Sequence, residues 1–378
     1  MTNKTYRIAT IPGDGIGPEV IRETKKVLEA GGTRFGYTLK WTDFPCSVNH
    51  YLETGDILTS SMLEEMKKHD ALLLGAIGDP RVKPGTIERG ILLTLRFELD
   101  QYVNLRPAKS FARTPLPVKI PEGEQIDILV VRENTEDFYM GIGAVGRQQL
   151  SCDLATSRRL YSMSGSCSAS FDKDIRGAIQ LGIATEPGIR RITAWACEAA
   201  KKRGESRLTL ASKSNALPQI YGFWEEIARD EAKLQGMELT VANVDALCYH
   251  LVRTPQKYGV ILTPNMFGDI VSDLLGAIAG GLGIAAGANI GDGLSMFEPV
   301  HGSAPDIAGT GKASPVAAIL SGALLLEHLG LAKEAKMVEK AVGTYLETAS
   351  FENLPVEMGG KASTEKAGDR IASIVTGK

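Results

Sequence analysis

The chain lacks an excess of basic charge: of its 378 residues, 42 are lysine or arginine and 45 are aspartate or glutamate, for a net charge of −3. Electrostatic binding to nucleic acid or to an anionic membrane surface needs a basic field. The sequence therefore predicts neither partner. Cysteine is also scarce, with five residues at positions 46, 152, 167, 197 and 248 and no CxxC pair. An odd, dispersed set predicts reduced thiols in a cytoplasmic compartment, without a disulfide framework or a zinc site.

Long apolar runs are absent as well. Residues 274–291 carry no charge over 18 positions, but six of them are glycine. Such a weakly apolar stretch favours a buried helix that runs into a glycine-rich loop over a membrane span. The N-terminal residues lead directly into a strand-like segment, so we expect no signal peptide.

The length and the 43% hydrophobic content are enough for about two domains with buried cores. Short β-branched runs alternate with longer helical patterns, which predicts an α/β protein with substantial parallel strand pairing. We expect strands at 6–11, 39–44, 71–74, 126–131, 208–211, 239–243 and 260–263, and helices at 18–30, 61–68, 187–203, 217–234, 267–279, 315–329 and 332–349. The serine-rich segment 141–182 breaks this pattern. It is typical of a surface excursion or of an arm that reaches a partner subunit.

Two carboxylates, Asp269 and Asp273, lie four residues apart in a segment predicted to be helical. That spacing places both on one face of a helix, where like charges repel unless a cation lies between them. Oxygen ligands suit a hard divalent ion such as Mg²⁺ or Mn²⁺. A bare DxxxD pattern is more often a solvated helix edge, but the neighbours here are apolar, which favours a metal site.

The segment 11–19 (IPGDGIGPE) joins an expected strand to an expected helix. Its glycines follow a GxGxG spacing, whereas a dinucleotide fingerprint requires GxGxxG followed by an acidic ribose ligand. The pattern therefore predicts a tight structural turn beside an active site. It does not predict a Rossmann fold.

Three arginines, Arg96, Arg106 and Arg132, are separated in sequence but near strand ends. Arginine binds carboxylates in a planar, bidentate manner. Each residue alone is more often part of a surface ion pair. If the fold brings them together, they predict a site for a di- or tricarboxylate.

Three further residues are candidates for catalysis. Lys213 directly follows an apolar strand, where partial desolvation lowers the pKa of a lysine and makes it a usable base. Tyr139 is a candidate proton donor, although a lone tyrosine is more often amphipathic packing. Asp245 opens an expected helix, as a metal ligand or as a helix N-cap.

The loop 298–309 (EPVHGSAPDIAG) combines small residues with His301 and Asp306. It is able to wrap an adenosine group, with Asp306 accepting hydrogen bonds from a ribose diol and repelling a 2′-phosphate. In isolation it is only a loop.

Taken together, these motifs resemble the metal-dependent β-decarboxylating dehydrogenases, the family of isocitrate, 3-isopropylmalate, homoisocitrate and tartrate/D-malate dehydrogenases. The resemblance covers essentially the whole chain. The family's motifs occur in their usual order: 11–20 (IPGDGIGPEV), 95–96 (LR), 104–107 (NLRP), 131–134 (VREN), Lys213, 244–246 (VDA), 265–273 (NMFGDIVSD) and 298–309.

The resemblance implies an isopropylmalate-dehydrogenase-like α/β fold, with two α/β domains around a cleft, in a homodimer with shared active sites. A discontinuous large, cofactor-binding domain is expected at 1–103 and 265–378. A small domain is expected at 104–264, with an arm that clasps the partner.

The resemblance also implies roles for individual residues. Arg96, Arg106 and Arg132 would bind the malate carboxylates, and Tyr139 would protonate the enol that remains after CO₂ leaves. Asp269 and Asp273 would bind Mg²⁺ or Mn²⁺, with Asp245 and the proton acceptor Lys213 supplied by the other subunit. The cation would stabilise the negative charge that develops on the substrate oxygen. The implied NAD contacts are Glu88, Glu298, His301, Gly302, Ser303, Ala304, Asp306, Ile307 and Ser314.

NAD is the expected cofactor because NADP members tend to carry basic and tyrosyl groups where this chain has Asp306 and Ile307. Many NAD members have asparagine where this chain has Ser314. Leu92 and Leu93 match the isopropylmalate pattern and would form an apolar pocket for the 3-substituent. The polar residues that isocitrate members place in this region are absent.

The exact substrate stays open at this point. Residues 100–104 (DQYVN) resemble the tartrate/D-malate branch. The turn before Tyr139 lacks its usual glycine, and Ala194 replaces a second arginine that many members carry. The alternatives to 3-isopropylmalate are therefore D-malate or tartrate, or a specialised 3-substituted malate such as a phosphonomethyl or alkyl analogue. A non-enzymatic subunit is disfavoured, because none of the expected catalytic side chains is missing.

Overall fold

The computed structural model describes residues 4–111 and 113–377 of the chain. Contacts within the chain define two compact units. The first comprises Met1–Gln101, Leu105–Asp127 and Asp273–Lys378, and the second comprises Tyr102–Asn104 and Ile128–Ser272. The predicted large and small domains use other boundaries, and their division by function remains a prediction.

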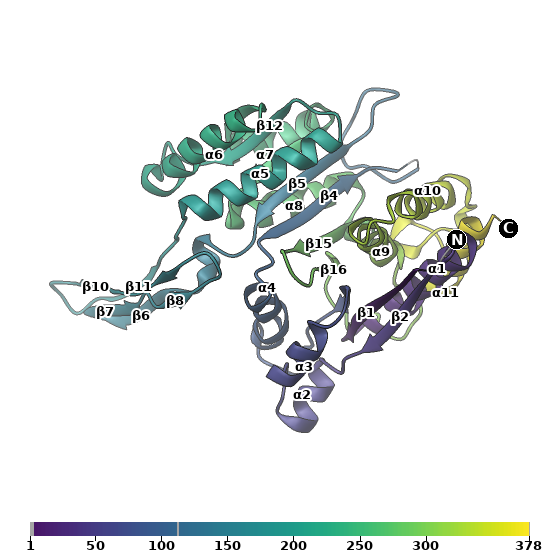
Figure 1. The fold of residues 1–378 in the computed structure, drawn as a ribbon, viewed down its shortest axis with the longest axis horizontal. Helices are drawn as coiled ribbons and strands as arrows, with labels where there is room; N and C mark the ends of the chain where they lie inside the picture. The colour runs from purple at the N-terminus through teal and green to yellow at the C-terminus, as the bar shows by residue number, and fades with distance from the viewer. Residues whose placement is uncertain (1–3, 112, 378) are drawn as a thin grey trace. The chain divides into compact units, whose positions relative to one another are not determined.

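Parallel strand pairing dominates the first unit (Figure 1). Its strands follow the order β4-β15-β16-β3-β1-β2. Within this order β15 pairs antiparallel with β16, whereas β1 pairs in parallel with both β2 and β3. The bounds are β1 Lys4–Gly13, β2 Tyr37–Asp43, β3 Ala71–Ala76, β4 Val103–Lys109, β15 Ala286–Ile290 and β16 Met296–Pro299.

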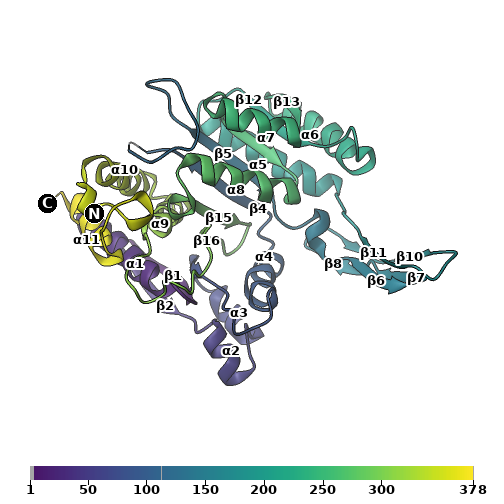
Figure 2. The same cartoon turned by 180° about the vertical axis from the view of Figure 1, so that it is seen from behind.

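Four helices of the first unit pack together (Figure 2). They are α1 (Gly17–Phe35), α9 (Val316–His328), α10 (Ala332–Thr348) and α11 (Thr364–Thr376). α9 is buried on nearly all sides because it lies against α1, α10, β15 and β16, as expected for a helix without a polar face. The shorter elements are α2 Val48–Thr54, α3 Ser60–Met66, the π-helix η1 Glu88–Leu93, α4 Thr94–Glu98, and the 3₁₀ turns η5 Leu282–Ile284, η6 Phe351–Asn353 and η7 Val356–Met358.

The second unit contains a parallel sheet in the order β13-β12-β14-β5. Its strands are β5 Asp127–Glu133, β12 Arg207–Ser212, β13 Glu238–Asn243 and β14 Val260–Thr263. Its helical segments are η2 Asp137–Met140, α5 Glu186–Lys202, η3 Pro218–Gly222, α6 Phe223–Leu234, α7 Val244–Arg253, η4 Pro255–Lys257 and α8 Asn265–Ala279, the last of which continues into the first unit.

Residues 143–180 of the second unit form an antiparallel ribbon that extends away from α5 and α6 (Figure 1). Its strands are β6 Gly143–Arg147, β7 Gln149–Asp153, β8 Thr156–Ser157, β9 Ser162–Met163, β10 Ser166–Ser170 and β11 Arg176–Gln180. The serine-rich sequence predicts a surface excursion or an arm here, but it does not predict these strands. The proposed contact with a partner remains a prediction.

The predicted α/β class is confirmed, and every expected strand and helix has a counterpart. Local signals explain the helix ends. Pro18 stands in the first turn of α1, and Gly36 follows it with φ 83°, as the asymmetry of helix termini predicts. Thr185 caps α5 by accepting a hydrogen bond from the Gly188 amide. No helix in the described part of the chain has the length and hydropathy of a membrane span.

Candidate active site

In the second unit, several predicted site residues lie at the carboxyl ends of neighbouring parallel strands. Arg132 is the penultimate residue of β5, and it is in register with Thr263 at the end of β14. Lys213 directly follows β12, and Asp245 lies two residues beyond β13 in the first turn of α7. The carboxyl edge of a parallel sheet is where ligands bind in open α/β folds. The sheet topology therefore places these residues along one edge of the sheet, and their roles in a shared site remain a prediction.

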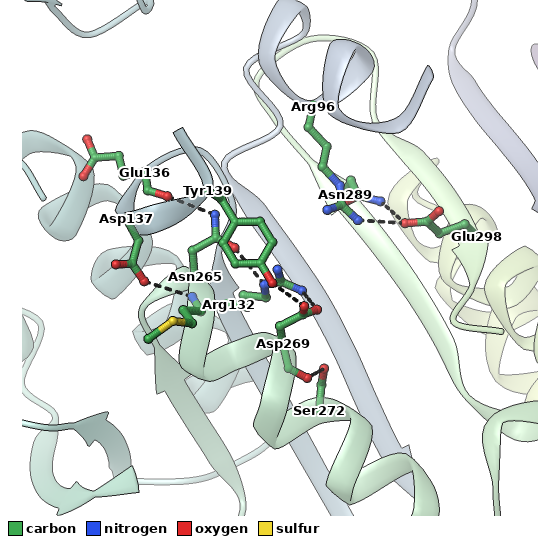
Figure 3. Close-up of polar contacts among 11 residues, drawn as sticks. Arg96, Arg132, Glu136, Asp137, Tyr139, Asn265, Asp269, Ser272, Asn289 and Glu298 are labelled. Atoms are coloured by element: carbon green, nitrogen blue, oxygen red, sulfur yellow. Dashed lines mark hydrogen bonds and ion pairs between the residues drawn. The ribbon is translucent and has the colours of Figure 1, made fainter. Parts of the chain in front are cut away.

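The Arg132 guanidinium links β5 to the start of α8 (Figure 3). Its Nε donates to Asn265 Oδ1 at 3.0 Å, and its Nη1 forms an ion pair with Asp269. The Arg132 side chain is 1% exposed and that of Asp269 is 40% exposed. Asp269 is thus held by a buried arginine, while part of its side chain remains exposed to solvent.

Tyr139 reaches the same carboxylate. Its hydroxyl donates to Asp269 Oδ2 at 2.5 Å, and the Arg132 guanidinium lies 5.1 Å from the centre of its ring, within the range of a cation–π contact. Two effects raise the pKa of Tyr139 to about 12: burial is the larger cause, and the hydrogen bond to Asp269 is the next. The predicted acid, one substrate arginine and one metal ligand thus form a single hydrogen-bonded group.

Asp273 lies one helical turn beyond Asp269 on α8 and is exposed. Asp245 belongs to a different pair: the Lys213 ammonium donates to its Oδ1 at 2.6 Å. This hydrogen bond lowers the pKa of Asp245. Asn243 occupies the N-cap position of α7, which leaves Asp245 in the first turn. No cluster of three or more metal-ligating His, Cys, Asp or Glu side chains occurs within residues 4–111 and 113–377.

Asp137 is a site residue that the sequence analysis missed. It has φ 65°, in the left-handed region that favours glycine, and it occupies the turn where the family's usual glycine is missing. Its buried carboxylate accepts a hydrogen bond from the Met266 amide at 2.9 Å, at the start of α8. The side-chain acceptor therefore ties the turn that carries Tyr139 to the helix that carries Asp269. The absent glycine was the sequence signal for this feature.

Two buried glutamates support the same turn. Glu133 accepts hydrogen bonds from the amides of Thr135 and Glu136, and Glu136 accepts from the amide and hydroxyl of Thr185. Burial raises the pKa of both carboxyls, and the charge of Glu136 raises that of Glu133 further. The Glu136 carbonyl also accepts from Asn265 Nδ2 at 3.1 Å. These contacts fix the backbone that leads to Tyr139.

In the first unit, Arg96 and Glu298 form a buried ion pair (Figure 3). Arg96 Nη2 lies 3.3 Å from Glu298 Oε1, and Asn289 Nδ2 donates to the same oxygen at 2.7 Å. Arg106, on β4, packs against Gly287 of β15, where an added Cβ would lie 3.4 Å from Arg106 Cδ and Nε. Asn289 was not predicted from the sequence, because it lies in a glycine-rich stretch that was expected to be a loop.

Leu92 and Leu93 lie in the π-helix η1, just before Arg96 on α4. Both side chains are half-buried, and Leu92 packs against an apolar cluster that contains Ile91 and Leu95. π-Helical turns occur frequently at functional sites. The turn holds two leucines close in sequence to a predicted substrate arginine, and their contact with a substrate remains a prediction.

The loop predicted to hold the cofactor is fixed by the glycine turn after β1. The Ile16 amide donates to the Ser303 carbonyl at 2.8 Å, and a Cβ at Gly15 would lie only 1.9 Å from that oxygen. Ala304 and Ile307 pack against a small apolar cluster that includes Ile16. The glycine is therefore needed for close approach to the loop, in agreement with the predicted structural turn.

The other predicted cofactor residues lie on or near this loop. His301 Nδ1 lies 3.0 Å from the Gly302 carbonyl oxygen, and burial lowers the pKa of the imidazole. Its buried Nε2 has no hydrogen-bond partner in the described part of the chain. Asp306 is exposed, whereas Ser314 is buried and its hydroxyl accepts from the Val316 amide.

Glu88, the first residue of η1, lies close to the loop that contains Ser303. A Cβ placed on Gly78 would lie 3.0 Å from Glu88 Oε1 and 3.8 Å from Ser303 Oγ. Asp14 orders the same region, since its carboxylate accepts from the amides of Val48 and Gly78. Burial raises the pKa of Asp14. Asp14 was not singled out as a functional residue, although it lies inside the glycine motif.

A surface cavity of about 540 Å³ lies elsewhere in the second unit, at the amino ends of β12 and β14. Its lining includes Arg207, Gln256 and Tyr258. None of the predicted site residues lines it, so it is distinct from the carboxyl edge described above.

The class of protein follows from comparison of the whole chain. Residues 7–371 match the family model of isocitrate/isopropylmalate dehydrogenases. The chain therefore belongs to that family and is an oxidoreductase of the dehydrogenase class.

Individual relatives cover nearly the full length. The chain is 41% identical to the 3-isopropylmalate dehydrogenase of Thermobifida fusca, over 99% of each chain. It is 42% identical to the 3-isopropylmalate dehydrogenase of Nocardia farcinica, over 98% of this chain and all of the relative.

Solved structures agree with this assignment. Isocitrate dehydrogenase from Methylococcus capsulatus aligns with a TM-score of 0.81 and 32% identity, covering 98% of this chain and 99% of the other. The β-decarboxylating dehydrogenase of Thermococcus kodakarensis, in its apo form, aligns with a TM-score of 0.75 and 37% identity, covering 98% and 96%. The predicted family and the isopropylmalate-dehydrogenase-like fold are confirmed.

Proposed function

We propose that the protein catalyses the NAD- and divalent-metal-dependent oxidative decarboxylation of a 3-substituted malate, with 3-isopropylmalate as the substrate. The observation that carries this proposal is the full-length similarity, at 41% and 42% identity, to relatives named 3-isopropylmalate dehydrogenase. The apolar pair Leu92 and Leu93, placed just before Arg96, supports a branched alkyl substituent over a third carboxylate.

The residues fit a hard divalent cation. Asp269 and Asp273 offer carboxylate oxygens one turn apart on α8, and the Asp245 side chain is 68% exposed. We assign Asp269 and Asp273 of one chain and Asp245 of a second copy as the ligands, because carboxylate oxygens suit Mg²⁺ and Mn²⁺. When bound, the cation supplies stabilisation of negative charge on the substrate oxygen.

The loop around His301 fits NAD. A Cβ at Gly302 would meet nothing within 4 Å in the described part of the chain, and the buried His301 Nε2 lacks a protein partner there. We assign His301 and its neighbours to the adenosine half of NAD. Asp306 would accept from the ribose hydroxyls, and Glu88 would lie near the nicotinamide, which accepts the hydride.

Side chains of the protein supply the other functions, which are carboxylate binding and proton transfer. Arg96, Arg106 and Arg132 bind and orient the malate carboxylates, since the guanidinium matches carboxylate geometry. In its neutral amine form, Lys213 Nζ accepts the proton from the substrate hydroxyl, and the Tyr139 hydroxyl donates a proton to the carbon that loses CO₂. The hydrogen bonds of Asp137 and Glu136 hold the Tyr139 turn in place for this transfer.

The assembly is part of the proposal. A homodimer with shared active sites would combine Lys213 and Asp245 of one copy with Asp269 of the other, and the ribbon 143–180 would act as the clasping arm. The large, cofactor-binding domain, the small domain and the cytoplasmic location are proposed on the same resemblance.

A substrate panel tests the proposal. Purified protein with Mn²⁺ and NAD would be assayed for NADH with 3-isopropylmalate, D-malate, tartrate, isocitrate and 3-alkylmalates. We expect the highest kcat/KM with 3-isopropylmalate. A higher value with D-malate, tartrate or another 3-substituent would reassign the substrate within the class, and a higher value with isocitrate would refute the apolar pocket. NADH from none of them would support a non-enzymatic subunit instead.

A further inference from the structure

Two of the five cysteines, Cys152 and Cys167, lie directly opposite each other in the antiparallel ribbon 143–180. The antiparallel register of β7 and β10 pairs Cys152 with Cys167. The register is constrained on the side of the turn, because β8 and β9 continue the same pairing to a tight turn where the Arg158 amide donates to the Tyr161 carbonyl. A shift of register would require that turn to reform. The two cysteines are therefore held as neighbours although 14 residues separate them in sequence.

The hydrogen-bond pattern defines the type of pair. The Leu154 amide donates to the Gly165 carbonyl, and the Phe171 amide donates to the Gln148 carbonyl. Because hydrogen-bonded and non-hydrogen-bonded pairs alternate along an antiparallel ladder, the cysteines occupy a hydrogen-bonded pair. Such pairs have Cα atoms about 5.5 Å apart. This separation lies within the range of about 4.4–6.8 Å found across disulfides.

Burial shows that both side chains share one face of the hairpin. Cys152 and Cys167 are half-buried free thiols, and each is flanked by exposed residues: Ser151 and Asp153 on β7, and Ser166 and Ser168 on β10. Directly paired residues project from the same face of the ladder. The two thiols therefore face each other at a site that solvent reaches in part.

The other three cysteines are different. Cys46 and Cys197 are buried, and burial raises the pKa of each thiol to about 11. Cys248 lies alone on α7, where burial also raises its pKa. The thiolate is the reactive form of cysteine, so these three are poor sites of oxidation.

We infer that Cys152 and Cys167 form a reversible dithiol–disulfide site that reacts with a small-molecule disulfide. One thiolate attacks a sulfur of the small disulfide and releases one small thiolate, which leaves a mixed disulfide. The second thiolate then attacks the protein sulfur of that bond and releases the second small thiolate. Two protein thiols lose two electrons, and the small disulfide is reduced to two thiols.

The bond joins the two strands of the hairpin and closes a covalent loop around its turn. Cross-strand Cβ atoms lie about 4.5–5.5 Å apart, whereas a disulfide needs about 3.5–4.5 Å. The strands must therefore approach slightly when the bond forms. A bond that forms under such strain is reduced easily, which makes the site responsive to the redox state of its surroundings. The inference does not depend on the proposed function.

The experiment uses the intact protein in buffers of reduced and oxidised glutathione, followed by alkylation, tryptic digestion and mass spectrometry. We expect two of the five thiols to disappear and residues 148–158 to be linked to residues 160–173 within one chain. Dithiothreitol should restore both thiols. In Cys152→Ser and in Cys167→Ser, the reaction should end with one glutathione adduct on the remaining cysteine of the pair. The matched control Cys248→Ser should form the same internal disulfide as the wild type.

Three results would overturn the inference. The first is retention of all five thiols in excess oxidised glutathione. The second is stable glutathione adducts on both cysteines of the wild-type chain. The third is a linkage between two chains, seen as a dimer on a non-reducing denaturing gel that either single serine variant abolishes.

Discussion

The Arg96 guanidinium and the Glu298 carboxylate are partners in a buried ion pair with 3.3 Å between Nη2 and Oε1. Their predicted roles differ, because Arg96 is expected to bind the substrate and Glu298 the cofactor. Their side chains are only 6% and 9% exposed. Each group therefore holds the other in place, and any role in ligand binding builds on a pair that is already ordered.

Removal of one partner of this ion pair should lower the stability of the protein. Arg96→Met leaves the Glu298 charge buried without its cation, and we expect the free energy of unfolding to fall by about 3–5 kcal/mol. The double variant Arg96→Met/Glu298→Met removes both charges and should recover most of that loss. Denaturant unfolding of the wild type, Arg96→Met, Glu298→Met and the double variant gives the four free energies to compare. A double variant as unstable as the sum of the single variants would show that the pair is not the relevant interaction.

The backbone at Asp137 gives a second prediction. Its φ of 65° penalises an ordinary side chain, so Asp137→Ala should be less stable than Asp137→Gly by about 1 kcal/mol, although both remove the bond to the Met266 amide. Asp137→Asn keeps an oxygen acceptor and tolerates this conformation, and it should be the mildest change. Thermal and denaturant unfolding compare the series. An alanine variant as stable as the glycine variant would contradict the strained turn.

Lys213 is predicted to move a proton. Lys213→Ala should lower kcat by about 10²–10⁴-fold while Mn²⁺ binding, followed by calorimetry, is largely retained. The matched control is Lys201→Ala on α5, which removes a lysine that forms an ion pair with Glu198 and should leave kcat unchanged. Turnover by Lys213→Ala at the wild-type rate would remove the lysine from the mechanism.

Cofactor preference tests the loop after His301. Asp306→Lys with Ile307→Tyr removes the carboxylate that would repel a 2′-phosphate, and it adds a cation. The ratio of kcat/KM for NAD to that for NADP should fall at least about 10-fold, equivalent to about 1.4 kcal/mol. Asp56→Lys makes the same charge change at the exposed Asp56 and serves as the control. An unaltered ratio in the double variant would defeat the ribose assignment.

The sequence predicted the parallel sheets because strands and helices follow local patterns, whereas the roles of the site residues remain predictions. Lys213 and Arg132 were found because each lies at the end of a short apolar strand. The GxGxG turn was recognised as structural because its spacing does not fit a dinucleotide fingerprint, and the close approach of Gly15 to Ser303 agrees with that interpretation.

The features that were missed depend on packing between distant segments. β15 lies in a glycine-rich stretch without strand alternation, so neither the strand nor the contact of Asn289 with Glu298 could be predicted from local pattern. The role of Asp137 became visible only when its φ and the Met266 amide were known. The pairing of Cys152 with Cys167 required the register of the hairpin, which composition does not give.

The most direct test of the proposed reaction is a simultaneous measurement of NADH and CO₂ from 3-isopropylmalate and NAD, with the protein freed of metal by a chelator and then resupplied with Mn²⁺. We predict equal amounts of NADH and CO₂, with both rates abolished in the chelated protein and restored by the metal. Formation of NADH without CO₂, or rates that the chelator leaves unchanged, would contradict a metal-dependent oxidative decarboxylation.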